Sequence, residues 1–233
     1  MKMNKTKDIR ILLITFDFEL SHYEINRFRG AIVKTTGNKN NLFHNHTEKG
    51  TIYRYPLIQY KRLGKKAALI CVEQGIEGIQ DFFSATDWNL EIGEEKHNVK
   101  VEQLKVRPHR VGIWEQHFHF RINNWLPLNQ PNYKKYHSLT GLSEKVQLLG
   151  QILTGHILSF LEGIDFLADK QIDVQISNIN TERVVPYKNQ DMQAFSLTFG
   201  TNVSLPNFIG LGKGSSVGFG VVKEIVKEKN NKR

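Results

Sequence analysis

The spacing of apolar and polar residues predicts the elements of the first half of the chain. Residues 9–20 alternate between the two types, which indicates a strand, and residues 23–36 place apolar residues at helical spacing. The further predicted elements are strands over 51–61 and 67–72, a helix over 74–86 and a strand over 99–111. The resulting order, β-α-β-β-α-β, is that of a ferredoxin-like unit.

The second half predicts a related arrangement. An aromatic-rich extended segment, 114–128, precedes a loop over 129–136 and a long helix over 144–163 with one apolar stripe. The predicted strands are 172–179, 182–187, 194–205 and 221–226. We therefore predict an α+β fold of two tandem ferredoxin-like domains with antiparallel sheets, divided into residues 1–112 and 113–233.

A glycine-rich run occupies residues 210–222, near the end of the chain, and leads into a β-branched strand. Glycine adopts positive φ without strain, and successive amides in such a loop can form a concavity that holds a phosphate. The run lacks the Lys-Ser/Thr pair of a Walker loop, and a strand follows it instead of a helix. The alternative interpretation is a hairpin with glycine bulges at a sheet edge.

The net charge, the single cysteine and the absence of long apolar stretches limit the kinds of molecule that the protein is expected to bind. The formal net charge of the 233 residues is +9, which favours a polyanion, with nucleic acid first and an acidic membrane surface second. The one cysteine, Cys71, lies in an apolar run and is interpreted as a small buried hydrophobic residue. No signal-peptide pattern or membrane-length apolar stretch is present, so we expect a cytoplasmic protein without a membrane partner.

Two histidines in a predicted loop are the best catalytic candidates. His44 and His46 follow the first helix, and Tyr53 comes seven residues after the second of them. Imidazole titrates near neutral pH, so the pair can serve as general base and general acid, while a phenol can donate a hydrogen bond. RNA carries its own nucleophile, the 2′-hydroxyl group, so such a set would suffice for RNA cleavage without a metal. The alternative is a surface loop with incidental histidines.

A second histidine pair permits a metal interpretation. His117 and His119 project to one face of a predicted strand, and Glu115 lies on the same face. Their spacing matches no diagnostic metal motif, so packing or RNA contact is favoured and no metal ligand is predicted.

Basic residues recur along the first helix and the first hairpin, between tyrosines that can stack on bases. The predicted RNA-binding residues are Arg27, Arg29, Arg54, Lys61, Gly210, Gly212, Lys213, Gly214, Ser215, Gly218 and Gly220.

Several motifs resemble those of the CRISPR-associated repeat-processing endoribonucleases, of the repeat-associated mysterious protein superfamily, and among them the type I-B-like subgroup. They are Phe28-Arg29-Gly30, the histidine loop 42–46 and the tyrosine-rich stretch 53–61. The glycine run resembles the glycine-rich loop of the wider superfamily. The resemblance extends over about residues 9–75 and 140–226, and residues 86–140 do not contribute to it.

The resemblance implies cleavage of precursor CRISPR RNA within each repeat, without metal or cofactor. The implied products are a 2′,3′-cyclic phosphate and a 5′-hydroxyl end. The resemblance also implies that His44, His46 and Tyr53 are the active-site residues, with His46 as the main acid/base, and that the glycine loop binds the RNA backbone. A lysine often joins such sites, and here Lys61 and Lys39 are the candidates.

Two other functions are consistent with parts of the sequence. A non-catalytic repeat-RNA-binding subunit of an effector complex would share the glycine loop and the basic charge but would not need the histidine pair. A metalloenzyme would use His117 and His119. The expected partners are CRISPR repeat RNA and other subunits of an effector complex, and the expected state is a monomer or homodimer.

Overall fold

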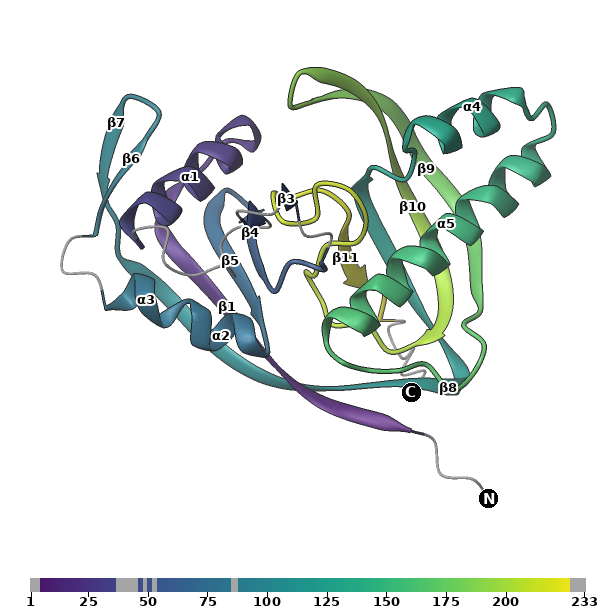
Figure 1. Ribbon diagram of the computed structural model, residues 1–233, viewed down its shortest axis with the longest axis horizontal. Helices are drawn as coiled ribbons and strands as arrows, with labels where there is room; N and C mark the ends of the chain where they lie inside the picture. The colour runs from purple at the N-terminus through teal and green to yellow at the C-terminus, as the bar shows by residue number, and fades with distance from the viewer. Residues whose placement is uncertain (1–4, 37–45, 48–49, 52–53, 85–87, 227–233) are drawn as a thin grey trace, which may run out of the picture.

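The computed structural model describes residues 5–36, 46–47, 50–51, 54–84 and 88–226 (Figure 1). Its first elements are β1 (Thr6–Glu19), η1 (His22–Glu24), α1 (Ile25–Thr35), β2 (His46–Thr47), β3 (Gly50–Thr51), β4 (Ile58–Leu63), β5 (Lys66–Val72), α2 (Gln74–Gly78), α3 (Gln80–Phe83), β6 (Asn89–Ile92) and β7 (Glu95–Asn98). The later elements are β8 (Val101–Trp125), α4 (Gln130–Ser138), α5 (Leu142–Gly163), β9 (Val174–Tyr187), β10 (Gln190–Val203) and β11 (Val221–Glu224).

One seven-stranded sheet connects the two halves of the chain. Its order is β4-β5-β1-β8-β10-β9, with β11 also paired to β8, and all of these pairings are antiparallel. Figure 1 shows β8 running along both halves. The first part of β8 pairs with β1 through Gly112, and the later part pairs with β10 and β11.

The two halves have the same strand order. Across the sheet, the first half has the order β8-β1-β5-β4, in which β8 is the fourth of these strands along the chain. The second half has the order β11-β8-β10-β9, in which β11 is the fourth of these strands along the chain. The glycine-rich segment takes the place of the second helix in that half. The predicted α+β class with antiparallel sheets is confirmed, and the second half is a closer counterpart of the first than its sequence indicates.

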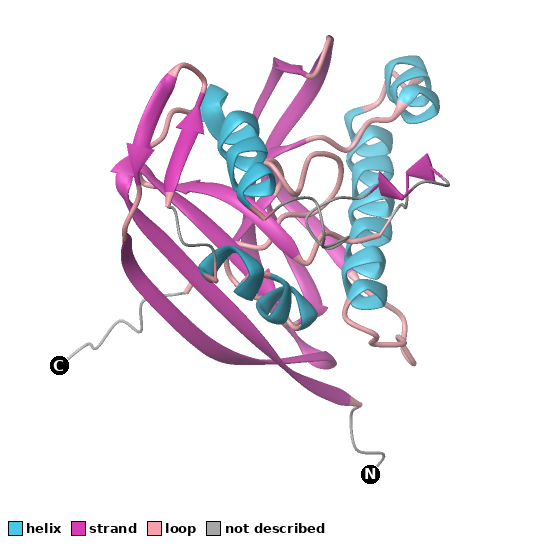
Figure 2. Ribbon diagram, turned by 60° about the vertical axis from the view of Figure 1, so that its left-hand side comes forward, coloured by secondary structure: helices cyan, strands magenta, loops and turns pink. Residues whose placement is uncertain are grey.

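Two layers of core hold the helices to the sheet. One face of β1 and β5 packs against α1 and α3, through buried residues that include Phe16, Phe28 and Phe82. The opposite face contributes Ile9 and Ile70 to a larger core with α5, β8 and β10. Figure 2 shows α5 as the long helix on the second half. Because this larger core contains residues from both halves, burial of apolar surface stabilises the two halves together.

The predicted helical faces are buried as expected. The predicted positions of α1 and of α5 that are buried are Ile25, Phe28, Ile32, Val33, Leu149, Leu153, Ile157, Phe160 and Leu161, while Val146 and Ile152 are half-buried. Cys71 is also fully buried, and burial raises the pKa of its thiol. It is a core residue, as predicted.

Several predictions about elements are wrong, and the two strands expected over 172–179 and 182–187 form the single strand β9. Residues 130–138 form α4 instead of a loop, because the Asn129 side chain accepts a hydrogen bond from the backbone N–H of Asn132 at 2.9 Å and Pro131 lies in the first turn. Residues 54–57 lie outside any strand, and β4 begins at Ile58. The two strands expected over 99–128 form the single strand β8, which passes through residue 112 without a break. The division at residue 112 stays a prediction.

None of the helices that the structure describes is long and apolar enough to cross a membrane.

Candidate functional site

The structure describes part of the predicted catalytic loop. His44 and Tyr53 lie outside the described residues. His46 begins β2, where its backbone pairs with that of Thr51 in β3, while its side chain lies outside the described part. The catalytic roles of these three residues therefore stay predictions. The segment that carries them connects α1 to β4.

The glycine-rich segment is docked on β4, the edge strand of the first half. The backbone N–H of Tyr60 donates to the carbonyl oxygen of Ser216 at 2.7 Å, and Tyr60 forms a parallel bridge with Val217. The Gln59 side chain accepts a hydrogen bond from the backbone N–H of Gly210 at 2.7 Å. The glycine-rich segment therefore covers the open edge of β4, and it does so with backbone groups.

Lys61 also belongs to this contact, which corrects its predicted role on the RNA-binding surface. Its side chain is fully buried, and its Nζ atom donates a hydrogen bond to the carbonyl oxygen of Ser215 at 2.8 Å. Burial lowers the pKa of Lys61 to about 7, because a charged amine loses its hydration there. Lys61 fixes the glycine-rich segment to β4 and does not face the solvent.

Several predicted RNA contacts in the glycine run are used within the protein. The backbone N–H of Gly210 donates to the Gln59 side chain. That of Ser215 donates to the Gly212 carbonyl oxygen, and that of Gly220 donates to the Asn124 carbonyl oxygen. These amides are therefore not open to a phosphate. Lys213 is exposed at the tip of the run and remains a predicted contact.

Two glycines in the run are required by close packing. Gly220 has φ +62, and a Cβ there would lie 2.0 Å from the Leu211 carbonyl oxygen. Gly212 has φ +81 and lies against the His156 ring, whose Nδ1 accepts a hydrogen bond from Trp125 Nε1 at 3.0 Å. Burial lowers the pKa of His156 to about 4, so the ring is neutral at pH 7. His156 is a packing residue of the interface between α5 and the glycine-rich segment.

Cationic groups from both halves gather around Tyr187, the last residue of β9. The ammonium group of Lys213 lies 5.6 Å from the centre of the Tyr187 ring, and that of Lys188 lies 5.9 Å from it. Burial raises the pKa of Tyr187, and the guanidinium group of Arg29 is near enough to oppose that rise. We call Arg29, Tyr187, Lys188 and Lys213 the junction cluster, because it joins α1 to the glycine-rich segment.

Of these four residues, Arg29 and Lys213 are predicted from the sequence, whereas Tyr187 and Lys188 are not. Tyr187 ends a predicted strand, and nothing in the sequence indicates that it meets Lys213 or α1. A cation near an aromatic ring on a partly exposed surface is an arrangement that binds nucleic acid through phosphate contact and base stacking.

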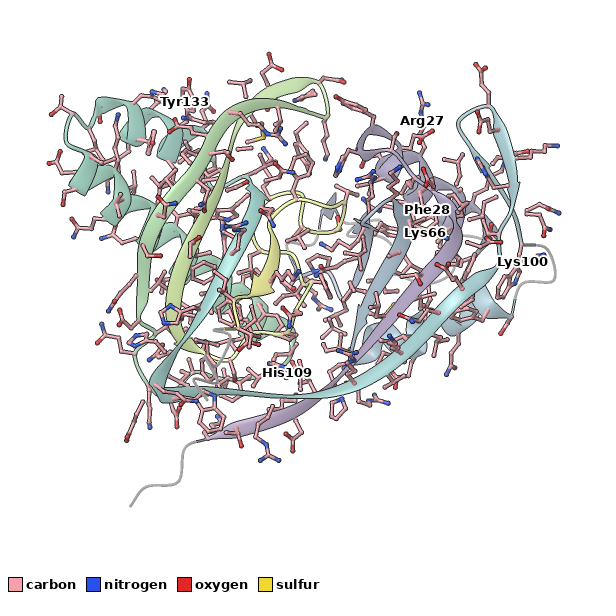
Figure 3. All side chains as sticks on the ribbon, turned by 180° about the vertical axis from the view of Figure 1, so that it is seen from behind. Arg27, Phe28, Lys66, Lys100, His109 and Tyr133 are labelled. Atoms are coloured by element: carbon pink, nitrogen blue, oxygen red, sulfur yellow. The ribbon has the colours of Figure 1, made fainter. Side chains whose placement is uncertain are left out.

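The structure does not bring all of the predicted basic residues together. Arg27 lies beside Gly93 in the turn between β6 and β7, and Figure 3 shows it near the outer end of α1, with Phe28 toward the sheet. Arg27 and Arg29 are two residues apart on a helix, which is a rotation of about 200° around the helix axis, so their side chains leave the helix on nearly opposite sides. Arg54 is exposed just before β4. Only Arg29 of these three belongs to the junction cluster.

The second histidine pair forms no metal centre in the part of the chain that the structure describes. His117 Nε2 lies 2.8 Å from a carboxylate oxygen of Asp173, in a hydrogen bond at the surface. No group of three or more histidine, cysteine, aspartate or glutamate side chains among the described residues is placed to hold a metal ion.

Two protein-family models together match nearly the whole chain. Residues 7–110 match the model of the Cas6b N-terminal domain, and residues 112–225 match that of the Cas6b C-terminal domain. These matches include residues 86–140, to which the sequence resemblance did not extend. Uncharacterized protein MJ0978 of Methanocaldococcus jannaschii is 31% identical over 134 residues, which are 57% of this chain and 90% of that protein.

Solved structures share the fold. A crystal structure of Cas6b superposes with a TM-score of 0.83 at 24% identity, over 94% of this chain and 100% of the other. A second, of the CRISPR RNA processing endoribonuclease Cas6b, gives 0.71 at 23% identity over the same shares. The type IV Cas6 crRNA endonuclease Csf5 gives 0.58 at 9% identity, over 94% and 100% of the two chains.

Proposed function

The chain belongs to the Cas6b family, and from this premise we propose that it is an endoribonuclease that cleaves precursor CRISPR RNA within the repeats. The observation that carries the proposal is the match of both family models, one to each half of the chain. The junction cluster supports it, because cations and an aromatic ring from both halves meet beside the glycine-rich segment.

In the proposed reaction the RNA supplies the nucleophile. His46, the main acid/base, and its partner His44 divide the two proton transfers between them: one removes the proton of the 2′-hydroxyl group and the other gives a proton to the departing 5′-oxygen. The bond from O2′ to phosphorus forms as the bond from phosphorus to O5′ breaks, and Tyr53 donates a hydrogen bond that orients the nucleophile or stabilises the phosphorane. The products are a 2′,3′-cyclic phosphate and a 5′-hydroxyl end, and no metal or cofactor takes part.

The test is cleavage of a labelled RNA of the source genome's CRISPR repeat in excess EDTA. We expect a single cut by the unmodified protein and none by His44→Ala/His46→Ala. The matched control is His117→Ala/His119→Ala, which removes two surface histidines from β8. It should cut like the unmodified protein. A deoxynucleotide at the cut position should abolish cleavage, because it removes the nucleophile.

Two outcomes would contradict the proposal. Tight binding without a cut by any variant would make the chain a non-catalytic RNA-binding subunit. Loss of cleavage in EDTA, or in the His117→Ala/His119→Ala control, would favour a metalloenzyme instead. Association with other effector subunits, and the monomeric or homodimeric state, stay predictions.

A further inference from the structure

Two arginines and a histidine from the two halves of the chain lie near one another. Arg62, near the end of β4, has its Nη1 atom 3.2 Å from Nε2 of His22 in η1. Its Nε atom donates to the backbone carbonyl oxygen of Leu20 at 2.6 Å, which fixes the plane of the guanidinium group. Two members of this group therefore come from the first half and are held rigidly.

The third member comes from the second half. Arg183 of β9 donates from Nη2 to Oδ1 of Asn124 at 2.7 Å. The backbone carbonyl of the same asparagine accepts the amide of Gly220, so Arg183 is tied to the end of the glycine-rich segment. Partial burial lowers the pKa of His22, and the charges of Arg62 and Arg183 lower it further. The field of Arg183 thus reaches the pair formed by the other two residues.

Nearby carboxylates do not neutralise this group. Glu24 accepts a hydrogen bond from the backbone N–H of Ser21 at 2.9 Å, and its side chain closes the start of η1. Glu182, next to Arg183, instead accepts hydrogen bonds from Tyr136 and Gln193. Within the described ranges, no ion pair includes His22, Arg62 or Arg183.

We propose that His22, Arg62 and Arg183, none of which belongs to the junction cluster, form a binding site for a phosphate of the RNA strand. Like charges held together repel one another, and a phosphate would relieve that repulsion while accepting charge-assisted hydrogen bonds from the guanidinium groups. The inference rests on the proposed function for the identity of the polyanion. We call these three residues the lateral site.

The position of the lateral site favours a nucleic-acid strand over a free anion. Arg183 and Tyr187 lie four residues apart on β9 and therefore on the same side of that strand, about 13 Å apart. An extended polyanion can contact the lateral site and the junction cluster together, whereas a single phosphate cannot. Tyr23, adjacent to His22 along the chain, is 85% exposed and offers a ring on which a base can stack.

The test measures binding without cleavage. The probe is a fluorescent 2′-O-methyl oligonucleotide of the CRISPR repeat, which keeps every phosphate but lacks the nucleophile. Fluorescence anisotropy over a series of KCl concentrations gives the affinity and its salt slope. We compare the unmodified protein with Arg62→Gln/Arg183→Gln and with Arg183→Gln alone. The matched control is Arg10→Gln, an exposed arginine that pairs with Glu77 at 2.7 Å.

We expect the double variant to bind about tenfold or more weakly, and its plot of log K against log salt to be shallower by about 0.7, which corresponds to one lost phosphate contact on a single strand. Arg183→Gln should give about half of that change in slope, and Arg10→Gln none. An unchanged affinity and slope in the double variant would overturn the lateral site. If Arg62→Gln prevents folding, Arg183→Gln decides the question, because that side chain is exposed.

Failure of this inference and failure of the proposed function give different results. If the unmodified protein cuts the repeat but the arginine variants bind it normally, only the lateral site is excluded. If binding depends on Arg62 and Arg183 but no RNA is cut, the lateral site is supported and the enzymatic proposal fails. If the unmodified protein does not bind the probe, both fail.

Discussion

The Nζ atom of Lys61 donates a hydrogen bond to the carbonyl oxygen of Ser215 at 2.8 Å, across 154 positions of sequence. The donor is in β4, the edge strand of the first half, and the acceptor is in the glycine-rich segment of the second. Both residues are buried. This contact places the segment that carries Lys213 at a defined position relative to α1, which carries Arg29.

The buried amine of Lys61 makes stability depend on pH. Its pKa is about 7 in the folded protein and about 10.4 in an unfolded chain, so between these values the unfolded chain binds more protons and stability rises with pH. We expect Lys61 to add about 2 kcal/mol to the free energy of unfolding between pH 7 and pH 9. Below pH 7 this contribution is absent, because the amine is charged in both states.

The measurement is urea denaturation at both pH values, for the unmodified protein and for Lys61→Met. The difference between the two proteins should change by the stated amount, because methionine does not titrate. Lys65→Met, at an exposed position of the same hairpin, is the matched control and should follow the unmodified protein. Parallel behaviour of Lys61→Met and the unmodified protein would show that the amine does not titrate in this range.

Gly220 and Gly155 should respond oppositely to alanine. At Gly220, φ is +62 and a Cβ would lie 2.0 Å from a carbonyl oxygen, so Gly220→Ala should destabilise the protein by roughly 2–4 kcal/mol. Gly155 lies in α5 with nothing within 4 Å of a Cβ, so Gly155→Ala should stabilise it by about 0.5–1 kcal/mol. Thermal denaturation checks both, and equal shifts would contradict the close approach of Gly220 to Leu211.

Removal of one buried hydroxyl group should increase stability. Among the described residues, the Tyr60 hydroxyl is buried without a hydrogen-bond partner, and burial raises its pKa. An unpaired buried polar group costs free energy, so Tyr60→Phe should raise the free energy of unfolding by about 1 kcal/mol. The control is Tyr133→Phe, at a side chain that is 49% exposed, which should change little. A loss of stability in Tyr60→Phe would mean that the hydroxyl group has a partner in solution.

Lys213 should contribute to RNA affinity without taking part in proton transfer. If its ammonium group contacts a phosphate beside Tyr187, Lys213→Gln should weaken binding of the repeat about fivefold and reduce the salt slope by about 0.7. The rate at saturating protein should stay within about twofold of the unmodified value. Lys34→Gln is the matched control, since Lys34 already pairs with Glu91 at 2.7 Å. An unchanged salt slope in Lys213→Gln would remove the junction cluster from the RNA path.

Local patterns were enough to predict the elements with strong periodicity. The alternation at the start of the chain gives β1, and the apolar spacing of α1 and α5 gives helices whose predicted faces are buried. The family resemblance, which is confirmed by the two matching domain families, was carried by short motifs such as Phe28-Arg29-Gly30. The cap formed by Asn129 was readable in principle, since Asn-x-Pro before polar residues is a helix-start signal, but the proline favoured a loop.

By itself, the sequence determined the fold class, the order of most elements and the family, because these depend on local periodicity and on short motifs. Only the tertiary structure decided that β8 belongs to both halves, that Lys61 points inward, that Tyr187 packs against the core beneath α1, and that Arg183 lies near enough to His22 to lower its pKa. A lysine on a hairpin has the same local signal whether its amine faces solvent or a carbonyl oxygen. The choice depends on the glycine-rich segment, which contacts β4 from 154 positions further along the chain and whose position depends on a core shared by both halves.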